Sequence, residues 1–259
     1  MYPPQTILSL VNPEQVSRVR AAAPRGAVVR TVGFKDLRAY SADLVGGAVV
    51  IDPEEWHSEA ATVAATFATT SGAQLVIYSR PTDRVCLQIA AIAKIVIPEV
   101  VLVETDDSIP HLRSVIARST SSVPALVLRD LSTQLALLGD PLGPMVTACF
   151  SWAAIPRKVD ELCQLIGLSR KRILTALDHH GLGTTRVILE AARVARAFHY
   201  LADGTAITTA ADESGFGSEG AMRGAFQRAL GVSPHLAAHT LATPEAAAKL
   251  VRGLKPESM

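Results

Sequence analysis

The chain has 259 residues, of which 49% are hydrophobic, and a formal net charge of +1. This length predicts two domains of ordinary size, and the apolar content excludes an intrinsically disordered protein. The richest apolar run, residues 85–103, is interrupted by charged residues and a proline, so we expect neither a membrane span nor a signal peptide. The scattered cysteines Cys86, Cys149 and Cys163 indicate reduced thiols, so we expect a cytoplasmic protein.

The first half of the chain alternates apolar runs with helical patterns. Apolar runs predict strands at residues 6–11, 27–32, 47–52, 74–79 and 99–104. Helical patterns predict helices at residues 13–23, 35–42, 53–70, 82–95 and 108–119. Strands that are apolar almost throughout require a parallel sheet covered on both faces. We therefore expect residues 1–121 to form a flavodoxin-like, doubly wound α/β domain with a five-stranded parallel sheet.

Ligands of such a domain meet the carboxyl ends of the strands, so the residues there form a candidate site. Asp52 follows the third strand, Ser79 ends the fourth and Glu104 ends the fifth. This arrangement resembles the receiver domains of two-component response regulators, in which an Asp after the third strand is phosphorylated. The resemblance implies that Asp52 is the phospho-acceptor and that Ser79 is its hydroxyl neighbour.

Other positions depart from the receiver pattern. Val11 and Asn12 stand where receivers carry an acidic pair that binds Mg²⁺, and Glu104 stands where they carry a Lys. Because Mg²⁺ prefers carboxylate oxygens and an anion repels a phosphoryl group, we expect a degenerate receiver. In that interpretation Asp52 caps the helix that follows it. A phosphorylation-gated response regulator remains the alternative.

Residues 122–143 lie between the two halves. Leucines at helical spacing predict an amphipathic helix at residues 125–138, which ends at the turn sequence of residues 139–144. This helix has more Leu than a lone surface helix normally exposes, so we expect it to support a homodimer.

Residues 159–234 contain the same spacing of a small residue and a glycine twice. Cys163 stands four residues before Gly167, and Ala211 stands four residues before Gly215. The small side chain lets two helices cross closely, and the glycine allows a turn with positive φ. Each copy continues into an amphipathic second helix, and a long helical pattern at residues 184–201 joins the copies. Two helix-turn-helix units are therefore predicted.

The paired units resemble the DNA-binding domain of the AraC/XylS family of transcription regulators. The matching residues are Leu162, Gly167, Ser169 and Ile173 in the first unit, and Gly215, Phe216, Phe226, Gly231, Ser233 and Pro234 in the second. The resemblance implies that residues 144–241 form an all-α, AraC-type double helix-turn-helix domain that binds double-stranded DNA. Residues 242–259 are then expected to form a tail.

The second helix of each unit has a predicted outward face. At 3.6-residue spacing, residues 169–180 turn Lys171 and Thr175 outward, whereas Gly220 and Gly224 occupy much of the outward face of residues 218–230. We expect the first helix to read bases and the second to contribute less. The candidate DNA-contacting residues are Ser169, Arg170, Lys171, Arg172, Leu174, Thr175, Ser218, Glu219, Arg223, Gln227 and Arg228.

The connecting helix at residues 184–201 is expected to serve as core for both units. Its predicted apolar stripe includes Val187, Ile188, Ala191, Ala195, Phe198 and Leu201. Arg186, Arg193 and Arg196 fall on its other faces and are candidates for contacts with phosphates.

The charge distribution favours a nucleic-acid partner for the second half. Residues 1–150 carry 12 basic and 14 acidic side chains, whereas residues 151–259 carry 13 basic and 10 acidic ones. No phosphate-binding loop, dinucleotide fingerprint, nucleophile elbow or zinc-protease motif is present in the sequence.

We therefore expect a transcription regulator that is not an enzyme and that has no cofactor or metal. Its N-terminal domain would bind a small-molecule or protein effector, dimerise or contact a partner. The alternative from another class is a small α/β enzyme or metabolite-binding protein whose C-terminal helices only pack.

Overall fold

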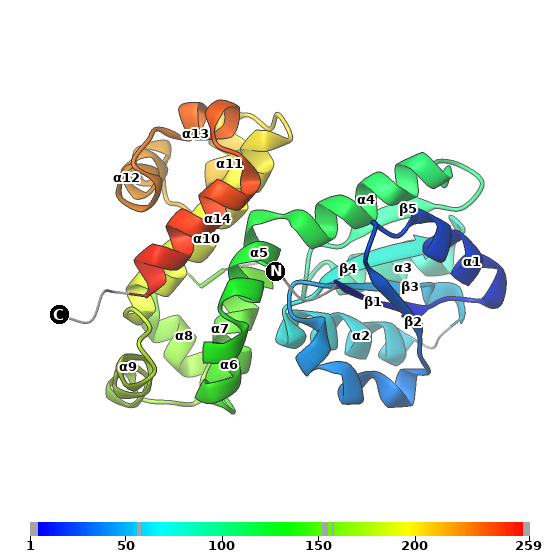
Figure 1. Cartoon of the computed structure of the whole chain (residues 1–259), viewed down its shortest axis with the longest axis horizontal. Helices are drawn as coiled ribbons and strands as arrows, with labels where there is room; N and C mark the ends of the chain where they lie inside the picture. Colours follow the sequence, from blue (N-terminus) through cyan, green and yellow to red (C-terminus); the bar gives the residue numbers. More distant parts are fainter. Residues whose placement is uncertain (1–4, 56–57, 152–154, 157, 256–259) are drawn as a thin grey trace. The chain divides into compact units, whose positions relative to one another are not determined.

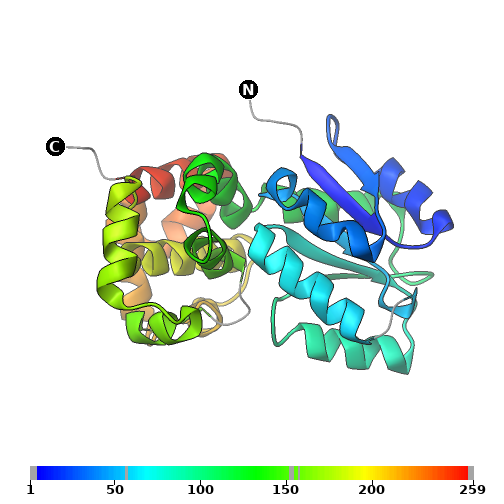
Figure 2. The same cartoon turned by 90° about the horizontal axis from the view of Figure 1, so that it is seen from below.

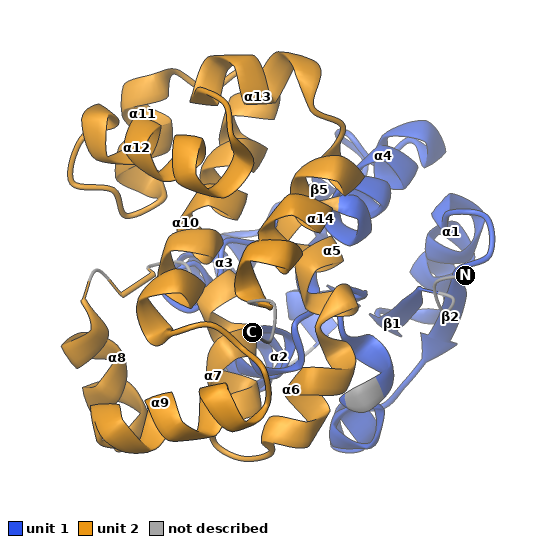
Figure 3. Cartoon of the chain, turned by 60° about the vertical axis from the view of Figure 1, so that its left-hand side comes forward, with its two compact units in different colours: residues 1–121, 151–153 blue, residues 122–150, 154–259 orange. Residues whose placement is uncertain are grey.

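The computed structural model describes residues 5–55, 58–151, 155–156 and 158–255. The chain forms two compact units, one of residues 1–121 and 151–153 and the other of residues 122–150 and 154–259 (Figure 3). Within the described ranges, no helix combines the length and the apolar character that a membrane crossing needs.

The first unit is built on a five-stranded sheet in which all neighbouring strands are parallel. The strands are β1 (Thr6–Leu10), β2 (Val28–Thr31), β3 (Ala48–Ile51), β4 (Gln74–Ser79) and β5 (Glu99–Leu102). Their order across the sheet is β2-β1-β3-β4-β5. This is the flavodoxin-like order, in which the direction of winding reverses between β1 and β3. The prediction of a five-stranded parallel sheet is confirmed.

Helices cover both faces of this sheet, because alternate residues of the buried strands point to opposite sides. The helical segments are α1 (Pro13–Ala22), α2 (Ser58–Ser71), α3 (Asp83–Ile92), α4 (Ile109–Ser121) and the 3-10 segments η1 (Phe34–Tyr40), η2 (Ala42–Leu44) and η3 (Pro53–Glu55). Ile7 and Val50 belong to the core under α1 and α4, whereas Leu8 and Val49 belong to the core under α2 and α3. In Figure 1, α4 lies above the strands, α1 lies at their right-hand end and α2 lies below them; Figure 2 views the α2 side.

Two predicted α-helices of this unit differ in part. The segment expected at residues 35–42 is the 3-10 helix η1, and the segment expected at residues 53–70 begins with the 3-10 turn η3. Leu37 is the one buried residue of η1, so this segment lacks the apolar stripe that stabilises an α-helix on a sheet. The α-helical prediction for residues 35–42 is therefore wrong.

The described residues of the second unit contain helices and no strand. The helices are α5 (Val123–Asp130), α6 (Ser132–Leu138), α7 (Leu142–Ser151), α8 (Val159–Ile166), α9 (Arg170–His179), α10 (Thr185–Ala202), α11 (Ile207–Glu213), α12 (Glu219–Leu230), α13 (Pro234–Thr240) and α14 (Thr243–Leu254). The central helix is α10, which packs against α5, α9, α11, α12, α13 and α14.

The expected linker helix at residues 125–138 is two helices, α5 and α6, separated at Leu131. Residues 123–128 are all buried, because α10 and α14 pack against α5, whereas α6 buries only Leu135 and Leu138. The leucines that suggested a dimer contact are buried inside this unit, and they therefore do not support a homodimer; they are Leu126, Leu128, Leu131, Leu135 and Leu138.

The region expected to be a tail forms α14 and belongs to the core of the second unit. Its apolar stripe, Ala246, Ala247, Leu250 and Leu254, is buried against α5, α10 and α12. The segments expected as a linker and as a tail thus share one compact unit with the helices between them, and the apolar faces of α5 and α14 cover each other.

Candidate functional site

The first helix pair of the second unit is α8 and α9, which are joined by a tight turn. Gly167 has a φ of +66°, a left-handed conformation that is unfavourable for residues with a side chain. The N–H of Leu168 donates to the carbonyl oxygen of Cys163 at 3.3 Å and closes the end of α8. Ser169 opens α9, because its Oγ accepts a hydrogen bond from the N–H of Arg172 at 3.4 Å.

The second pair, α11 and α12, has the same turn geometry. Gly215 has a φ of +76°, and the N–H of Phe216 donates to the carbonyl oxygen of Ala211 at 2.9 Å. Ser218 opens α12, because its Oγ accepts from the N–H of Ala221 at 3.1 Å. The glycine turns that the sequence predicted are therefore present at both positions.

The long helix α10 connects these two pairs. In Figure 1, α9 lies near the lower end of α10 and α12 lies to the upper left of α10, and both are seen nearly end on. Each second helix buries one side: Ile173 and Leu177 of α9 are buried, as are Met222 and Phe226 of α12. The opposite sides of α9 and α12 face solvent, as the helical spacing predicted.

The exposed side of α9 is strongly basic. Arg170, Lys171, Arg172 and Thr175 are exposed, and Leu174 is half-buried. Within the described part of the chain, none of these three cations takes part in an ion pair. The first turn of α9 contains no acidic residue, so its positive helix end and three cations lie together.

The polar side chains of α12 have partners within the chain. Glu219 pairs with Arg223 at 3.4 Å across one helical turn. The amide nitrogen of Gln227 donates to the carbonyl oxygen of Gly231 at 3.2 Å, at the end of the helix. The outward surface of α12 is therefore less charged than that of α9.

Arg228 of α12 also has a partner that the sequence did not indicate. Its Nε donates to Oε1 of Glu190 at 3.0 Å, and its Nη2 donates to Oε2 at 2.7 Å. These hydrogen bonds and the charge of Glu190 raise the pKa of Arg228. Because the two residues are 38 positions apart, no local sequence pattern could pair them.

The arginines of α10 occupy three different environments. Arg186 is exposed, whereas Arg193 is half-buried and donates through Nη2 to the carbonyl oxygen of Pro156. Arg196 is only 8% exposed, and burial lowers its pKa. Arg196 was expected off the apolar stripe as a candidate for a phosphate contact, but helices packed around α10 enclose it, so this expectation is wrong. Val187, expected in the core, is 38% exposed.

A cavity of about 450 Å³ lies between the two helix pairs, and we call it the basic hollow. Five basic and two acidic side chains are among its lining residues, namely Lys158, Arg170, Arg186, Arg193 and Arg228 with Asp160 and Glu190. The excess of basic side chains in this hollow therefore favours the binding of an anion.

The first unit has a different cavity, also of about 450 Å³, at the carboxyl ends of its strands. Asp52, at its floor, is 2% exposed. Its Oδ1 accepts from Ser79 Oγ at 2.5 Å and from the N–H of Glu54 at 3.0 Å, and its Oδ2 accepts from Gln15 Nε2 at 2.8 Å. The structure thus brings Asp52 and Ser79 together, and it places Asp52 as a cap of η3.

The surroundings of Asp52 are acidic. This acidic hollow is lined by two arginines and by six carboxylates, which are Glu14, Asp52, Glu54, Glu55, Glu104 and Asp107. The Glu104 side chain is 74% exposed and pairs with Arg80 at 3.4 Å. A phosphoryl group at Asp52 would meet a net negative environment.

A second polar group that the sequence did not reveal joins α1 to β4. Arg18 Nε donates to the hydroxyl of Tyr78 at 2.8 Å, and that hydroxyl donates to Asp107 Oδ2 at 3.1 Å. Arg18 Nη2 pairs with the same oxygen at 3.0 Å. Burial raises the pKa of Tyr78. These bonds fix one wall of the acidic hollow.

In the residues that the structure describes, His, Cys, Asp and Glu side chains do not form a group of three or more that could hold a metal ion. Comparisons of the chain with protein-family models, with curated proteins and with solved structures give no match. Function is therefore inferred from the chain's own residues.

Proposed function

We propose that this protein is a sequence-specific transcription regulator that binds duplex DNA through the second helices of its two helix pairs. One observation carries the proposal: the same glycine turn and serine cap occur twice, on either side of α10, and each leads into a helix with an exposed outer side. An α-helix fits the major groove of B-DNA, and two such helices on one unit can enter successive groove segments. This is the arrangement that the AraC/XylS resemblance implies.

The charge on α9 supports a phosphate-bearing partner. Arg170, Lys171 and Arg172 lie at the positive end of the helix dipole without an ion pair in the described residues. Cations at this end of a helix are each unfavourable by roughly 0.3–1 kcal/mol. Contacts with phosphates would offset this cost.

The basic hollow supports the same partner between the two helices. If α9 and α12 each enter a major-groove segment of one duplex, the DNA backbone between these segments must cross the protein surface between the two helices. Five basic side chains line the hollow on that surface, so it offers cations where phosphates would pass.

Within this proposal the two helix pairs contribute differently. Lys171 and Thr175 are exposed on α9 and can reach base edges. Gly220 and Gly224 of α12 have no side chain to offer, and Arg228 is held by Glu190. We therefore assign base recognition mainly to α9 and positioning on the backbone mainly to α12.

We assign regulation to the first unit. Its parallel sheet provides a cavity at the carboxyl ends of the strands, where domains of this kind bind effectors or partners. We assign Asp52 a role in the fold of this unit and not in phosphoryl transfer, since its carboxylate accepts hydrogen bonds from three donors in an acidic hollow.

Selection of bound DNA from random duplexes by the full chain tests the proposal. We expect an enriched sequence with two blocks of base preference about one helical turn, or about 10 base pairs, apart. A control selection uses Ile173→Asp, which removes a buried contact of α9. If the wild-type chain enriched no sequence beyond that control, the alternative of an α/β enzyme or metabolite-binding protein would replace the regulator.

A further inference from the structure

The second unit contains a pocket of about 380 Å³ between α10, α12 and α14, which we call the apolar pocket. Val187 and Ala191 of α10, Ala229 of α12 and Leu250 of α14 contribute apolar surface to it. Its size lies in the range of small-molecule sites, roughly 300–1,000 Å³.

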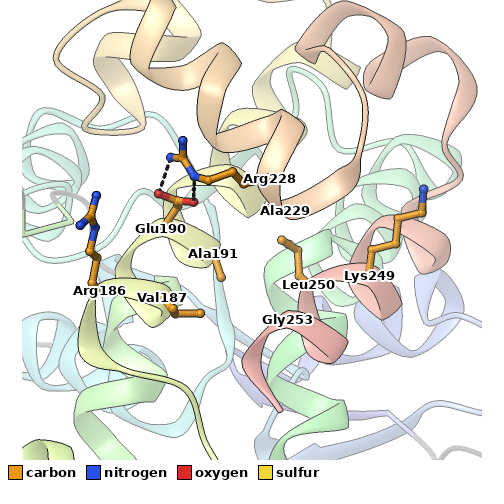
Figure 4. A pocket seen from close by; sticks show the side chains of 9 residues that line it. All are labelled: Arg186, Val187, Glu190, Ala191, Arg228, Ala229, Lys249, Leu250 and Gly253. Carbon is orange, nitrogen blue, oxygen red and sulfur yellow. Dashed lines mark hydrogen bonds and ion pairs between the residues drawn. The ribbon is translucent and has the colours of Figure 1, made fainter. Parts of the chain in front are cut away.

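The chemistry of its walls is divided. In Figure 4, the apolar side chains of Val187, Ala191 and Leu250 lie below the charged ends of Arg186, Arg228 and Lys249. Glu190 is the one acidic residue among those that line the pocket, and it pairs with Arg228. Lys249 pairs in turn with Glu245, at 3.6 Å across one turn of α14. With both carboxylates counted, the three cations leave the rim a net charge of +1, beside an apolar floor.

Two of the lining positions, Val187 and Gly253, do not fill the space of this pocket. Val187 stands at a core spacing of α10, yet 38% of it is exposed. Gly253 of α14 faces the same space, and a Cβ added there would meet no atom within 4 Å. A larger side chain at position 253 would therefore fill space that the fold leaves unoccupied.

We propose that the apolar pocket binds a small amphipathic carboxylate, with its apolar body on Val187, Ala191 and Leu250 and its carboxylate among Arg186, Arg228 and Lys249. An apolar body gains free energy from contact with the floor. A carboxylate at the rim gains charge-assisted hydrogen bonds from guanidinium and ammonium groups. Lys249 is already positioned at this rim, since its Nζ donates to the carbonyl oxygen of Leu230 at 3.1 Å.

Such a ligand would act on the contact between α10 and α12. Its carboxylate competes with Glu190 for Arg228, which is the cation of the rim that α12 supplies. Binding would therefore weaken the ion pair that joins α12 to α10. The effect on DNA binding rests on the proposed function, but binding of the carboxylate does not.

Calorimetric titration of the full chain with sodium octanoate and sodium benzoate tests the site without DNA. We expect at least one of these carboxylates to bind at one site per chain, and 1-octanol and octylammonium, which have the same chain without the negative charge, to bind about tenfold more weakly than octanoate. Gly253→Leu should weaken carboxylate binding about tenfold or more by filling the pocket. Ala248→Leu, at an exposed position of the same helix outside the pocket, should leave it unchanged.

Four results would overturn the proposal: neither carboxylate binds, the Gly253→Leu variant binds the carboxylate as tightly as the wild type does, octanol binds as tightly as octanoate, or inorganic phosphate binds as tightly as octanoate. If circular dichroism shows that Gly253→Leu is unfolded, Ala229→Leu fills the same pocket from α12 and replaces it. Inorganic phosphate is the last probe, and binding of phosphate as tightly as octanoate would show a plain anion site without an apolar requirement. Since these titrations contain no DNA, their failure leaves the DNA-binding proposal untouched.

Discussion

Arg228 of α12 and Glu190 of α10 form a bidentate ion pair, with hydrogen bonds of 3.0 and 2.7 Å. The pair joins the second helix of the second helix pair to the long helix that connects both pairs. It also neutralises a cation that faces the basic hollow. The sequence predicted that Arg228 contacts DNA, whereas in the structure its guanidinium binds a carboxylate of the same chain.

The Arg228–Glu190 pair predicts a non-additive effect on DNA binding. Arg228→Ala should lower the affinity for all duplexes, because it leaves the negative charge of Glu190 in the basic hollow. Glu190→Gln in the same chain should restore much of this loss, and fluorescence anisotropy of labelled duplexes measures the double-mutant cycle. Equal affinities of Arg228→Ala with and without Glu190→Gln would show that the pair does not influence DNA. The effect on stability should be small, about 0.2–1 kcal/mol, since the Arg228 side chain is 62% exposed.

Different roles for α9 and α12 predict different effects on base preference. Lys171→Ala or Thr175→Ala should relax the preference at one or two positions of the selected sequence, at a cost of about 1–3 kcal/mol. Arg223→Ala should instead lower the affinity nearly equally for all sequences, because we assign Arg223 a contact with the phosphate backbone. Binding-site selection with each variant measures this difference. Loss of a distinct block of base preference in Arg223→Ala, with an unchanged sequence in Lys171→Ala, would reverse the two assignments.

The two glycine turns predict position-specific losses of stability. Gly167→Ala and Gly215→Ala should each lower the free energy of unfolding by about 1–2 kcal/mol, because both residues have positive φ. Gly217→Ala is the matched control, since Gly217 does not have a positive φ and a Cβ added there would meet no atom within 4 Å. Urea unfolding followed by circular dichroism measures all three. A Gly217→Ala loss as large as the other two would contradict the explanation by backbone conformation.

The fold of the first unit could be predicted because its strands carry a strong local signal. Val49 and Val50, for example, are both apolar and point to opposite faces of the sheet, so only a sheet covered on both faces can bury them. The inward side of α9 was predictable for a similar reason, since Ile173 and Leu177 lie four residues apart and are both buried.

Contacts between distant residues could not be predicted in this way. The ion pair of Glu190 and Arg228, and the bonds of Tyr78 with Arg18 and Asp107, depend on packing that no short pattern encodes. The packing of α14 did leave a signal, because Ala246, Ala247, Leu250 and Leu254 follow helical spacing; the spacing does not specify which helix covers that stripe.

The hydrogen bonds of Asp52 predict a structural role for this residue. Treatment with acetyl phosphate and Mg²⁺ should leave Asp52 unmodified, because Ser79, Gln15 and Glu54 occupy its carboxylate. Asp52→Asn should lower the free energy of unfolding by about 1–3 kcal/mol, since an amide N–H₂ replaces one acceptor oxygen and faces a donor. Mass spectrometry and urea unfolding measure the two effects. A stoichiometric, acid-labile phosphoryl group on Asp52 would restore the phosphorylation-gated alternative.

The salt dependence of DNA binding tests the central claim most directly. The affinity of the full chain for its selected duplex is measured by anisotropy between about 50 and 200 mM salt, beside a chain in which Arg170, Lys171 and Arg172 are all replaced by Gln. We expect the plot of log affinity against log salt concentration to have a slope of about −3 to −5, because each phosphate contact contributes about −0.9. The triple replacement should make this slope about 2 to 3 units less negative. A wild-type chain that shows no binding at the lowest salt, or a slope that the triple replacement leaves unchanged, would contradict DNA recognition through α9.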